Sequence, residues 1–342
     1  MILLIRANHA NSFELQNYAP LAKKLDIHVV TSRHPLTPIA LPHTKLWSPT
    51  DLPTFPYRRQ ILNRLIGGEQ WLIELEKLVK KSNGSNHRTI LHTAETYTPY
   101  THQAVQLRKR GVIQKLVCTC WETIPHNNEK FRRLRNWKKE AYKYVDLFHT
   151  PTNRAKEALI TEGVDPQKIT VIPYGIDLTH FHPPRIKSKH KKPVVLMVAR
   201  PVAEKGIDIF HQLESEFKDV AEFRLISNTS YSEMPTIYRS ADIFLLPSLT
   251  TPTWEEQYGM SLIEAMASGL PIVTTRSGAI PEVVGSAALL AAPNDIRTLS
   301  AHLSALISSP TLRAKYSRLA LTRAKKLYDS DKIALQLARL YD

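Results

Sequence analysis

Short apolar runs rich in β-branched residues recur along the chain, and longer segments of mixed polarity separate them. In the first half, these runs predict strands at residues 2–5, 27–32, 89–93, 115–119 and 147–150. Helices are expected between the strands, among them 15–24 and 101–110. Continuous apolar strands that alternate with helices are typical of a parallel sheet with helices on both faces.

The pattern breaks at Ile172-Pro-Tyr-Gly-Ile-Asp177, and a stretch rich in Pro, His and Lys follows at 180–192, as in a linker. A second series then predicts strands at 193–198, 222–226, 243–247, 271–275 and 287–291, and helices that include 207–217, 234–240 and 261–268. We therefore predict an α/β chain of two doubly wound domains, residues 1–177 and 178–325, with a hinge near 178. A carboxyl-terminal helix, residues 326–342, is expected to pack back toward the first domain.

Positive charge is concentrated in the first half of the chain. The net charge is +15, and residues 1–176 hold 26 Lys and Arg against 14 Asp and Glu, which leaves +12 there and +3 in the remainder. Such a field attracts phosphates, anionic membranes or nucleic acid, although a solvated basic surface is an equal alternative. Nucleic acid is not expected, because no recognisable module places stacking aromatics among the cations.

The segment 130–141 has apolar residues at helical spacing with cations between them. It predicts a core-facing helix with a basic outer side, and it leaves open a peripheral contact with an anionic membrane.

Two cysteines, Cys118 and Cys120, lie on one face of a predicted strand. Neighbours along one strand are poorly placed for a disulfide, and no second pair is present for a zinc site. We expect reduced, buried thiols in a cytoplasmic protein. No apolar run approaches the roughly 20 residues of a membrane helix, and the opening apolar run, stopped by Arg6, is typical of a first strand and not of a secretory signal.

Two glutamates flank a predicted helix start after the strand 243–247. Glu256 lies in the loop, Glu264 in about the first turn of the helix, and Gly269 with Pro271 ends that helix. The amino end of a helix offers unpaired N–H groups and a partial positive charge, which suit a phosphate oxygen. Carboxylates on either side of a phosphate suit hydroxyl groups on either side, one set on a sugar and the other on a ribose.

Two cations, Arg200 and Lys205, follow the predicted strand 193–198. At the carboxyl end of a strand they can hold a diphosphate and neutralise the charge that develops as a sugar leaves. This role replaces a divalent metal, so no metal site is expected, and the Asp329-Ser-Asp331 pair lies far from any phosphate loop in the sequence.

Four ordered segments together resemble glycosyltransferase family 4 across roughly residues 145–300. They are Ile172–Asp177, Arg200 to Gly206, Glu256 to Glu264, and Ser277-Gly-Ala-Ile-Pro-Glu282. The resemblance implies the GT-B fold, in which two Rossmann-like domains face each other across a cleft. It implies an acceptor-binding first domain, a donor-binding second domain, and transfer of a hexose from a nucleotide-diphosphate sugar (a UDP-sugar or GDP-mannose) with retention of configuration. No obligatory metal is implied, and a lipid-linked or cell-envelope glycan precursor is a candidate acceptor.

The resemblance also implies roles for individual residues. Arg200 and Lys205 would grip the diphosphate, Glu264 the ribose, and Glu256 the transferred sugar; the spacing favours Glu256 over its neighbour Glu255. Backbone amides would face the sugar and the β-phosphate, at the positions Tyr258, Gly259, Met260 and Ser261.

The first half departs from the family pattern. The loop 6–14 lacks the Gly-Gly pair of many members, and Trp121 or Glu122 stands where many carry a histidine. We keep four residues as candidates for contacts with the acceptor or the donor sugar: Glu122, His126, Asn11 and Glu95.

Two other functions remain open. A non-hydrolysing sugar-nucleotide 2-epimerase shares the GT-B shape, but the two glutamates argue against it. A non-catalytic sugar-nucleotide-binding subunit would be expected to have lost Arg200, Lys205 or Glu256, and all three are present.

Overall fold

The computed structural model describes residues 1–83, 89–184 and 190–342, so residues 185–189 of the predicted linker lie outside it. These residues form two compact units. Unit 1 comprises Met1–Tyr174 and Asp331–Asp342, and unit 2 comprises Gly175–Ser330. The last residues of the chain therefore belong to the same unit as the first.

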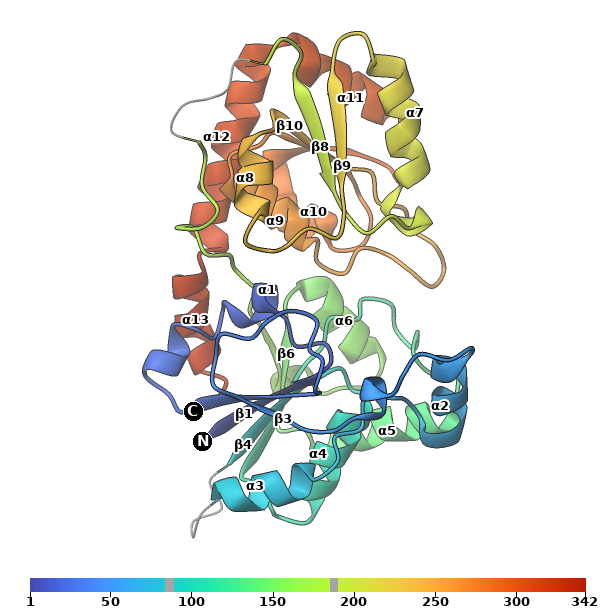
Figure 1. Ribbon diagram of the computed structural model, residues 1–342, viewed down its shortest axis with the longest axis vertical. Coiled ribbons are helices and arrows are strands. Elements are labelled where there is room, and N and C mark those ends of the chain that lie inside the picture. Colours follow the sequence, from blue (N-terminus) through green and yellow to red (C-terminus); the bar gives the residue numbers. More distant parts are fainter. Residues whose placement is uncertain (84–88, 185–189) are drawn as a thin grey trace. The chain divides into compact units, whose positions relative to one another are not determined.

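Within the described residues, unit 1 is built on a seven-stranded parallel sheet, of order β3-β2-β1-β4-β5-β6-β7 (Figure 1). Its strands are β1 (Ile2–Ala7), β2 (Ile27–Thr31), β3 (His43–Lys45), β4 (Ile90–Ala94), β5 (Lys115–Thr119), β6 (Leu147–Thr150) and β7 (Ile169–Val171). The strand order reverses between β1 and β4, where Ile2 pairs with Ile90. At such a switch point the loops leaving neighbouring strands part, and ligands bind outside the carboxyl ends of the strands.

Helices and short turns connect these strands. They are α1 (Ser12–Leu15), η1 (Leu21–Lys23), η2 (Pro49–Asp51), α2 (Arg58–Ile66), α3 (Leu75–Asn83), α4 (Pro99–Lys109), α5 (Arg132–Tyr144), α6 (Asn153–Thr161), η3 (Pro166–Lys168) and, at the end of the chain, α13 (Ser330–Ala338). The core includes fully buried Leu3, Ile5, Leu116 and Phe148, together with the free thiol Cys118.

Two expectations for unit 1 are wrong. The helix predicted at 15–24 is only the single turn α1 followed by η1, because Pro20 lacks the N–H that a continuous helix needs. The first strand extends through Arg6 to Ala7, so Arg6 does not end the strand. The predicted strands 115–119 and 147–150 are confirmed as β5 and β6.

Unit 2 contains, among its described residues, a five-stranded parallel sheet of order β12-β11-β10-β8-β9. Its strands are β8 (Val194–Val198), β9 (Glu222–Ile226), β10 (Ile243–Leu246), β11 (Ile272–Thr275) and β12 (Ala288–Ala291). Each predicted strand is present within one residue of its expected bounds. The strand order reverses between β8 and β10, so the carboxyl ends of these two strands mark the switch point of unit 2.

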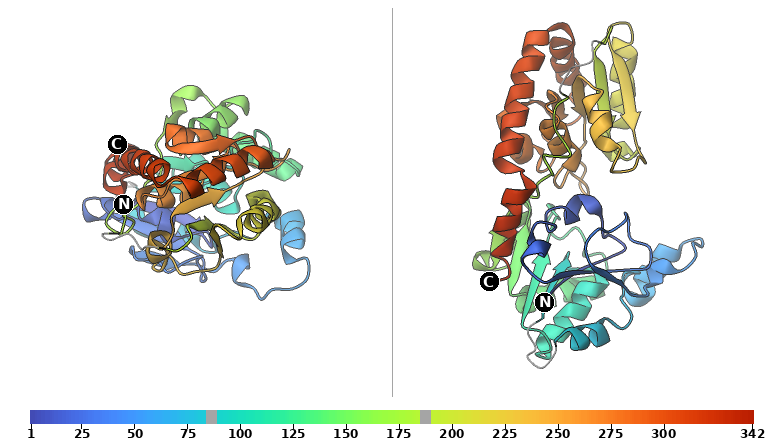
Figure 2. Two further views of the ribbon diagram at one scale, coloured as in Figure 1. Left: turned by 90° about the horizontal axis from the view of Figure 1, so that it is seen from above. Right: turned by 60° about the vertical axis from the view of Figure 1, so that its left-hand side comes forward.

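The helices of unit 2 follow the prediction closely. They are η4 (Ala203–Lys205), α7 (Ile207–Phe217), α8 (Met234–Arg239), α9 (Met260–Ala267), α10 (Ile280–Val284), η5 (Gly285–Ala287), α11 (Ile296–Ser308) and α12 (Pro310–Leu327). The long α12 runs along the side of the unit in both figures (Figures 1 and 2) and is fixed to α9's end by Ser317, whose Oγ donates to Gly269 O. Across the ranges that the structure describes, no helix has both the length and the apolar character required to cross a bilayer.

Candidate functional site

Lys205 and Glu256 form a close ion pair at the switch point of unit 2. Lys205 ends η4, shortly after β8, and Glu256 lies in the loop that follows β10. Lys205 Nζ donates to Glu256 Oε2 at 2.6 Å and lies 5.3 Å from the centre of the Trp254 ring. Ser248 Oγ donates to the same carboxylate oxygen at 3.1 Å. The Lys205 side chain is 16% exposed, so its ammonium is partly open to solvent.

The backbone at position 206 requires a glycine directly after Lys205. Its φ is +77°, and a Cβ there would lie 2.1 Å from Pro247 O, at the end of β10. Only glycine tolerates both the left-handed backbone and this close approach. The Lys205-Gly206 pair thus brings the loop after β8 against the end of β10.

The motif 277–282 holds the backbone of Glu256. A Cβ at Gly278 would lie 2.1 Å from Glu256 O, and Ala279 N donates to that oxygen at 2.8 Å. Glu256 N donates to Ser277 Oγ at 3.2 Å. These contacts fix Glu256 from both sides of its peptide, which gives the Ser-Gly-Ala segment a positioning role.

The amino end of α9 lies next to this pair in the sequence. Its N-cap is Gly259, at φ +80°, and no side chain among the described residues caps the helix there. The helix begins at Met260, so Met260 and Ser261 carry the first amides of the helix; Tyr258 is buried before it. A helix start without a side-chain cap keeps its N–H groups available to an anion.

Glu264 lies in the second turn of α9, one turn later than expected, and is 6% exposed. Tyr238 OH, from α8, donates to Glu264 Oε2 at 2.6 Å. Burial raises the pKa of Glu264 to about 7, although the hydrogen bond from Tyr238 opposes the rise. The carboxyl group therefore changes charge near neutral pH.

Arg200 lies in the loop between β8 and η4, and its side chain is exposed. The structure thus brings Lys205 and Glu256 into contact, and places Arg200 in the same loop as Lys205. Of the two neighbouring glutamates, Glu256 is the one that forms an ion pair with Lys205. Its contact with the transferred sugar, which the spacing favoured over one from Glu255, stays a prediction.

Glu122, in unit 1, is occupied within its own loop. Its Oε1 accepts from Thr123 N and Ile124 N at 3.0 Å, and its Oε2 accepts from the side-chain amides of Asn127 and Asn128 at 3.1 and 2.7 Å. This carboxylate holds the loop after β5 in shape, so a contact with substrate would have to displace one of these amides.

His126 lies in an acidic group with the geometry of a metal site. His126, Glu129 and Glu162 bring one ligand atom each within 4.8 Å of one another. Lys138 Nζ, however, donates to Glu162 at 2.6 Å and lies 3.2 Å from Glu129. The Lys138 ammonium therefore already lies between the two carboxylates and offsets part of their charge.

Glu95 and Asn11 follow β4 and β1, at the switch point of unit 1. Glu95 has a left-handed backbone, φ +62°, and accepts from Trp121 N at 2.8 Å. Burial raises the pKa of Glu95 to about 8, so most of this group is protonated at neutral pH. Asn11 caps α1, since its Oδ1 accepts from Glu14 N at 2.7 Å.

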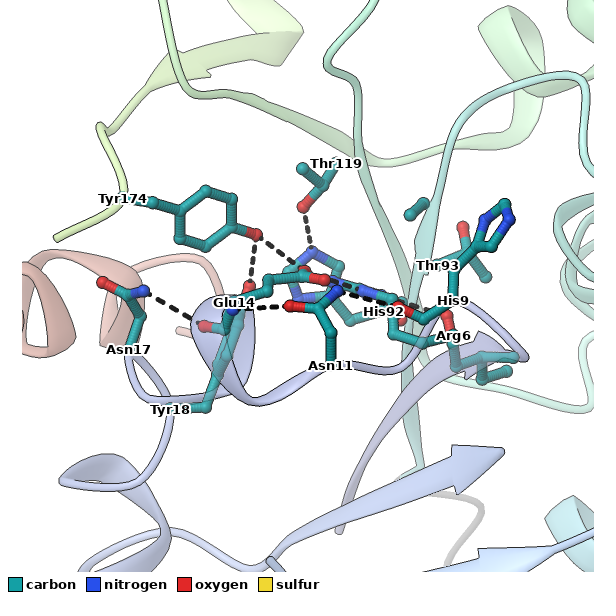
Figure 3. A network of polar contacts seen from close by, with 12 residues as sticks. Arg6, His9, Asn11, Glu14, Asn17, Tyr18, His92, Thr93, Thr119 and Tyr174 are labelled. Atoms are coloured by element: carbon teal, nitrogen blue, oxygen red, sulfur yellow. Dashed lines mark hydrogen bonds and ion pairs between the residues drawn. The ribbon is translucent and has the colours of Figure 1, made fainter. Parts of the chain in front are cut away.

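A buried polar network lies around Arg6 and Glu14, and Figure 3 shows it from close by. Arg6, 1% exposed, donates from Nε to Glu14 Oε1 and from Nη1 to His92 O, both at 2.8 Å. Tyr174 OH donates to the same Glu14 oxygen at 3.1 Å and lies 3.0 Å from Tyr18 OH. Most polar side-chain atoms of this network pair with one another at the switch point of their own sheet, although Arg6 Nη2 has no hydrogen-bond partner among the described residues. The switch point of unit 2, in contrast, carries the partly open Lys205.

The network continues through two neutral histidines to the carboxyl terminus. His149 Nε2 donates to Ile172 O at 2.7 Å. Burial lowers the pKa of His149 to about 4, so the ring is neutral and carries its one proton on Nε2. Its Nδ1 therefore accepts from Thr119 Oγ1 at 2.9 Å. Thr119 must then accept from His92 Nε2 at 2.7 Å, and His92 Nδ1 accepts from Tyr341 OH at 2.7 Å. The carbonyl at one end therefore fixes the direction of every hydrogen bond, and the chain ties residue 341 to the centre of the sheet.

Two family models match separate parts of the chain. Residues 69–180 match the model described as Glycosyltransferase Family 4, and residues 211–323 match the model described as Glycosyl transferases group 1. The second range contains the loop after β10, α9 and the motif 277–282. The chain belongs to glycosyltransferase family 4.

Relatives of this family 4 glycosyltransferase act on varied substrates. It is 27% identical to the MMP alpha-(1->4)-mannosyltransferase of Mycolicibacterium hassiacum, over 60% of this chain and 56% of that protein. It is also 27% identical to the N,N'-diacetylbacillosaminyl-diphospho-undecaprenol alpha-1,3-N-acetylgalactosaminyltransferase of Campylobacter jejuni, over 60% of this chain and 62% of that protein. The matches thus span less than two thirds of either relative.

The fold is confirmed by a solved structure. Sucrose-phosphate synthase from Thermosynechococcus elongatus matches 99% of this family 4 chain and 98% of its own, with a TM-score of 0.75 and 17% identity. The two parallel sheets of this family 4 glycosyltransferase are the two Rossmann-like domains of the GT-B fold.

Three residues that support the candidate site escaped the sequence analysis. Tyr238 orients Glu264, and Ser248 and Ser277 hold Glu256. Ser277 is the first residue of the motif 277–282, and Ser248 directly follows the predicted strand 243–247. Their places in the sequence could therefore have indicated that both lie near the candidate site. Tyr238 gave no such signal, because a tyrosine on a short helix is usually part of the core.

Proposed function

We propose that this protein transfers a hexose from a nucleotide-diphosphate sugar to an acceptor, with retention of configuration and without an obligatory metal. The observation that carries the proposal is the Lys205–Glu256 pair beside the uncapped start of α9, at the carboxyl ends of β8 and β10. A pyrophosphate there would receive a cation from one side and helix amides from the other.

Donor binding would exchange the partners of this ion pair. Lys205 would turn from Glu256 to the diphosphate, where its charge stabilises the leaving group as the glycosidic bond breaks. Glu256, released, would accept hydrogen bonds from hydroxyl groups of the transferred sugar. Arg200 would provide a second cation to the diphosphate, and Glu264 would accept from the ribose.

In this mechanism the acceptor attacks from the face that the diphosphate leaves. The leaving phosphate oxygen takes the proton of the acceptor hydroxyl, and the enzyme stabilises the charge-separated state between them. Retention then follows from attack on the same face, with no covalent intermediate required.

The acceptor that we propose is a lipid-linked or cell-envelope glycan precursor. Two observations support this acceptor. Residues 1–176 carry a net charge of +12, and the name of the Campylobacter jejuni relative contains diphospho-undecaprenol.

A thermal-shift panel tests the donor proposal. UDP-, GDP- and ADP-sugars are added separately to the full chain, and one base is expected to raise the melting temperature, since a ligand that binds only the folded state stabilises it by about 2.7 kcal/mol at 100 times its Kd. Lys205→Ala should lose most of the shift, while Lys326→Ala, an exposed lysine of α12, should keep it. A full shift in Lys205→Ala would place the donor elsewhere.

The stereochemical proposal is tested on the product. With the donor identified, the anomeric proton coupling of the transferred sugar is measured by NMR, and donor and product should share their configuration. Inversion would exclude the front-face mechanism, and donor turnover without an acceptor, to a 2-epimer, would exclude transfer itself.

A further inference from the structure

Exposed apolar side chains are concentrated in one segment of unit 1. Of the thirteen large hydrophobic residues that are exposed in the described part of the chain, eight fall between residues 47 and 73. We define the α2 surface as six of them, with exposures from 36% for Ile66 to 74% for Tyr57: Leu52, Phe55, Tyr57, Ile61, Leu65 and Ile66. Such a concentration marks an interaction site more often than a solvated surface.

The helix α2 has an apolar side that covers no core. Ile61 and Leu65 lie one turn apart, and Ile66 is next to Leu65, yet the helix contains no buried residue. Arg59 and Arg64 flank this side, and both are exposed. An amphipathic helix of this kind normally buries its apolar side, in the protein or in another apolar phase.

The helix is nevertheless attached firmly at its carboxyl end. A Cβ at Gly67, its C-cap, would lie 2.5 Å from the Trp137 ring, and Arg133 Nη1 donates to Leu65 O at 2.7 Å. In Figure 1 α2 projects at the rim of unit 1, next to α5. The apolar side is therefore held in place, at the periphery.

A hollow of about 470 Å³ opens beside α2. Its walls include Leu65, Ile66, Trp71 and Trp137, and Arg133 also lines it. This volume is large enough for a segment of hydrocarbon chain, and the guanidinium among apolar walls suits a chain that carries a phosphate at its end.

The neighbouring helix α5 presents only its basic side. It buries Trp137, Lys138 and Ala141, so its apolar side faces the core and does not form the membrane contact left open for it. Its exposed positions are basic except for Asn136: Arg132, Arg133, Arg135, Lys139 and Lys143. Arg133, which donates to Leu65 O, and the exposed Arg59 and Arg64 of α2 itself place positive charge beside the apolar surface.

We propose that the α2 surface binds an anionic lipid bilayer, with Ile61, Leu65 and Tyr57 in the interfacial region and the arginines of α2 and α5 against lipid phosphates. Apolar area and basic charge act together in such binding, because the charge concentrates the protein at the surface and the apolar side chains then insert. This inference goes beyond the proposed transfer reaction and does not depend on it.

Vesicle sedimentation of the full chain tests this proposal without any sugar nucleotide. Vesicles of phosphatidylcholine alone are compared with vesicles of phosphatidylcholine and phosphatidylglycerol in equal parts, at low and at high salt. Binding is expected only with phosphatidylglycerol, and it should weaken as salt screens the arginines. Equal recovery in the supernatant with both vesicles, or binding that ignores salt and lipid charge, would overturn the proposal.

Matched pairs of variants test whether the α2 surface is the part of the protein that binds the bilayer. Leu65→Glu should reduce the partition coefficient at least about tenfold, since a buried leucine contributes some 1.5–3 kcal/mol. Leu335→Glu is its control, because Leu335 is 62% exposed against 65% for Leu65 and lies on α13, on the opposite side of unit 1 (Figure 1). A double variant, Arg59→Gln with Arg64→Gln, should likewise weaken binding about tenfold. Its control is the double variant Lys23→Gln with Lys24→Gln, which changes the charge equally elsewhere in unit 1 and should bind as the parent does.

Equal loss in a variant and its control would refute this location. A second result would also refute it: the protein forms a concentration-dependent dimer, this dimer does not bind vesicles, and Leu65→Glu dissociates it. A second copy of the chain would then cover the α2 surface. Unchanged melting temperatures show that each variant is folded. Donor-induced thermal shifts should persist in Leu65→Glu, which separates a failure here from a failure of the proposed transfer.

Discussion

Each unit has an ion pair next to the switch point of its sheet, and the two pairs are built differently. In unit 1, Arg6 and Glu14 meet at 2.8 Å with exposures of 1% and 6%. In unit 2, Lys205 and Glu256 meet at 2.6 Å with exposures of 16% and 8%. Both lie where an α/β sheet offers room for a ligand, so topology alone does not explain the difference.

The difference lies in how many contacts fix each cation. Arg6 donates to Glu14 and to the main-chain oxygens of Ile5 and His92, so its planar guanidinium is held on several sides. Lys205 has one ion pair and a contact with the Trp254 ring. A single ammonium contact can be exchanged for a phosphate oxygen. A buried guanidinium with several partners cannot leave without disrupting the contacts between the central strands β1 and β4. Unit 1 uses its pair for structure, and unit 2 keeps its pair available.

The largest effect is expected in unit 1. Glu14→Ala leaves Arg6 buried without its counter-charge, which should lower the free energy of unfolding by about 3–5 kcal/mol. Urea unfolding followed by tryptophan fluorescence suits this test, because four of the five tryptophans, Trp254 excepted, lie in unit 1.

The control for this prediction is the exposed pair Lys77–Glu74. Glu74→Ala removes a bridge whose side chains are 80% and 61% exposed, and it should change the unfolding midpoint little. If Glu14→Ala behaved like Glu74→Ala, the Arg6–Glu14 pair would not be structural.

The next effect is on transfer. Lys205→Ala should reduce kcat by about 100- to 1,000-fold, because a fixed charge that stabilises the leaving diphosphate lowers the barrier by several kcal/mol in such reactions. The melting temperature is measured in parallel, since Glu256 loses its partner in this variant. Lys326→Ala should transfer at the parental rate, and parental transfer by Lys205→Ala as well would remove the lysine from the mechanism.

The sequence predicted unit 2 better than unit 1, for physical reasons. The strands of unit 2 are short, apolar and separated by well-marked helices, and Gly206, Gly259 and Gly278 stand where the backbone approaches itself or turns left-handed. Each constraint demands a glycine at one position, so it leaves a mark in the sequence even where the approaching backbone is distant in the chain. The positions of Lys205 and Glu256 followed from the same pattern.

In unit 1, the missing features depend on tertiary contacts. Arg6 follows an apolar run and was expected to end the strand, yet Glu14 and the main-chain oxygen of His92 in β4 permit its burial. The strand β3 is a three-residue edge whose residues are exposed or half-buried, so no alternation marks it. The helix α2 was not expected, because its apolar positions do not face the core.

The smallest effect concerns Glu264, the one group of the proposed donor site that titrates near neutrality. Burial raises its pKa to about 7, so its protonation stabilises the folded state at low pH, and this contribution is lost as the pH rises from about 4.5 to about 7. A ribose hydroxyl that donates to Glu264 prefers the ionised carboxylate, since a charged acceptor makes the stronger hydrogen bond. Affinity for the nucleotide sugar should therefore rise by up to about tenfold between pH 6 and pH 8.

Calorimetric titration across this range measures the effect, and a nucleotide sugar is the right ligand, because its diphosphate diester has no ionisation near pH 7. Glu264→Gln should bind more weakly at pH 8 and show a flat profile. Tyr238→Phe should move the rise to higher pH, since it removes the hydrogen bond that opposes the raised pKa. If the pH dependence persisted in Glu264→Gln, another group would be responsible and the ribose contact would have to be assigned elsewhere in unit 2.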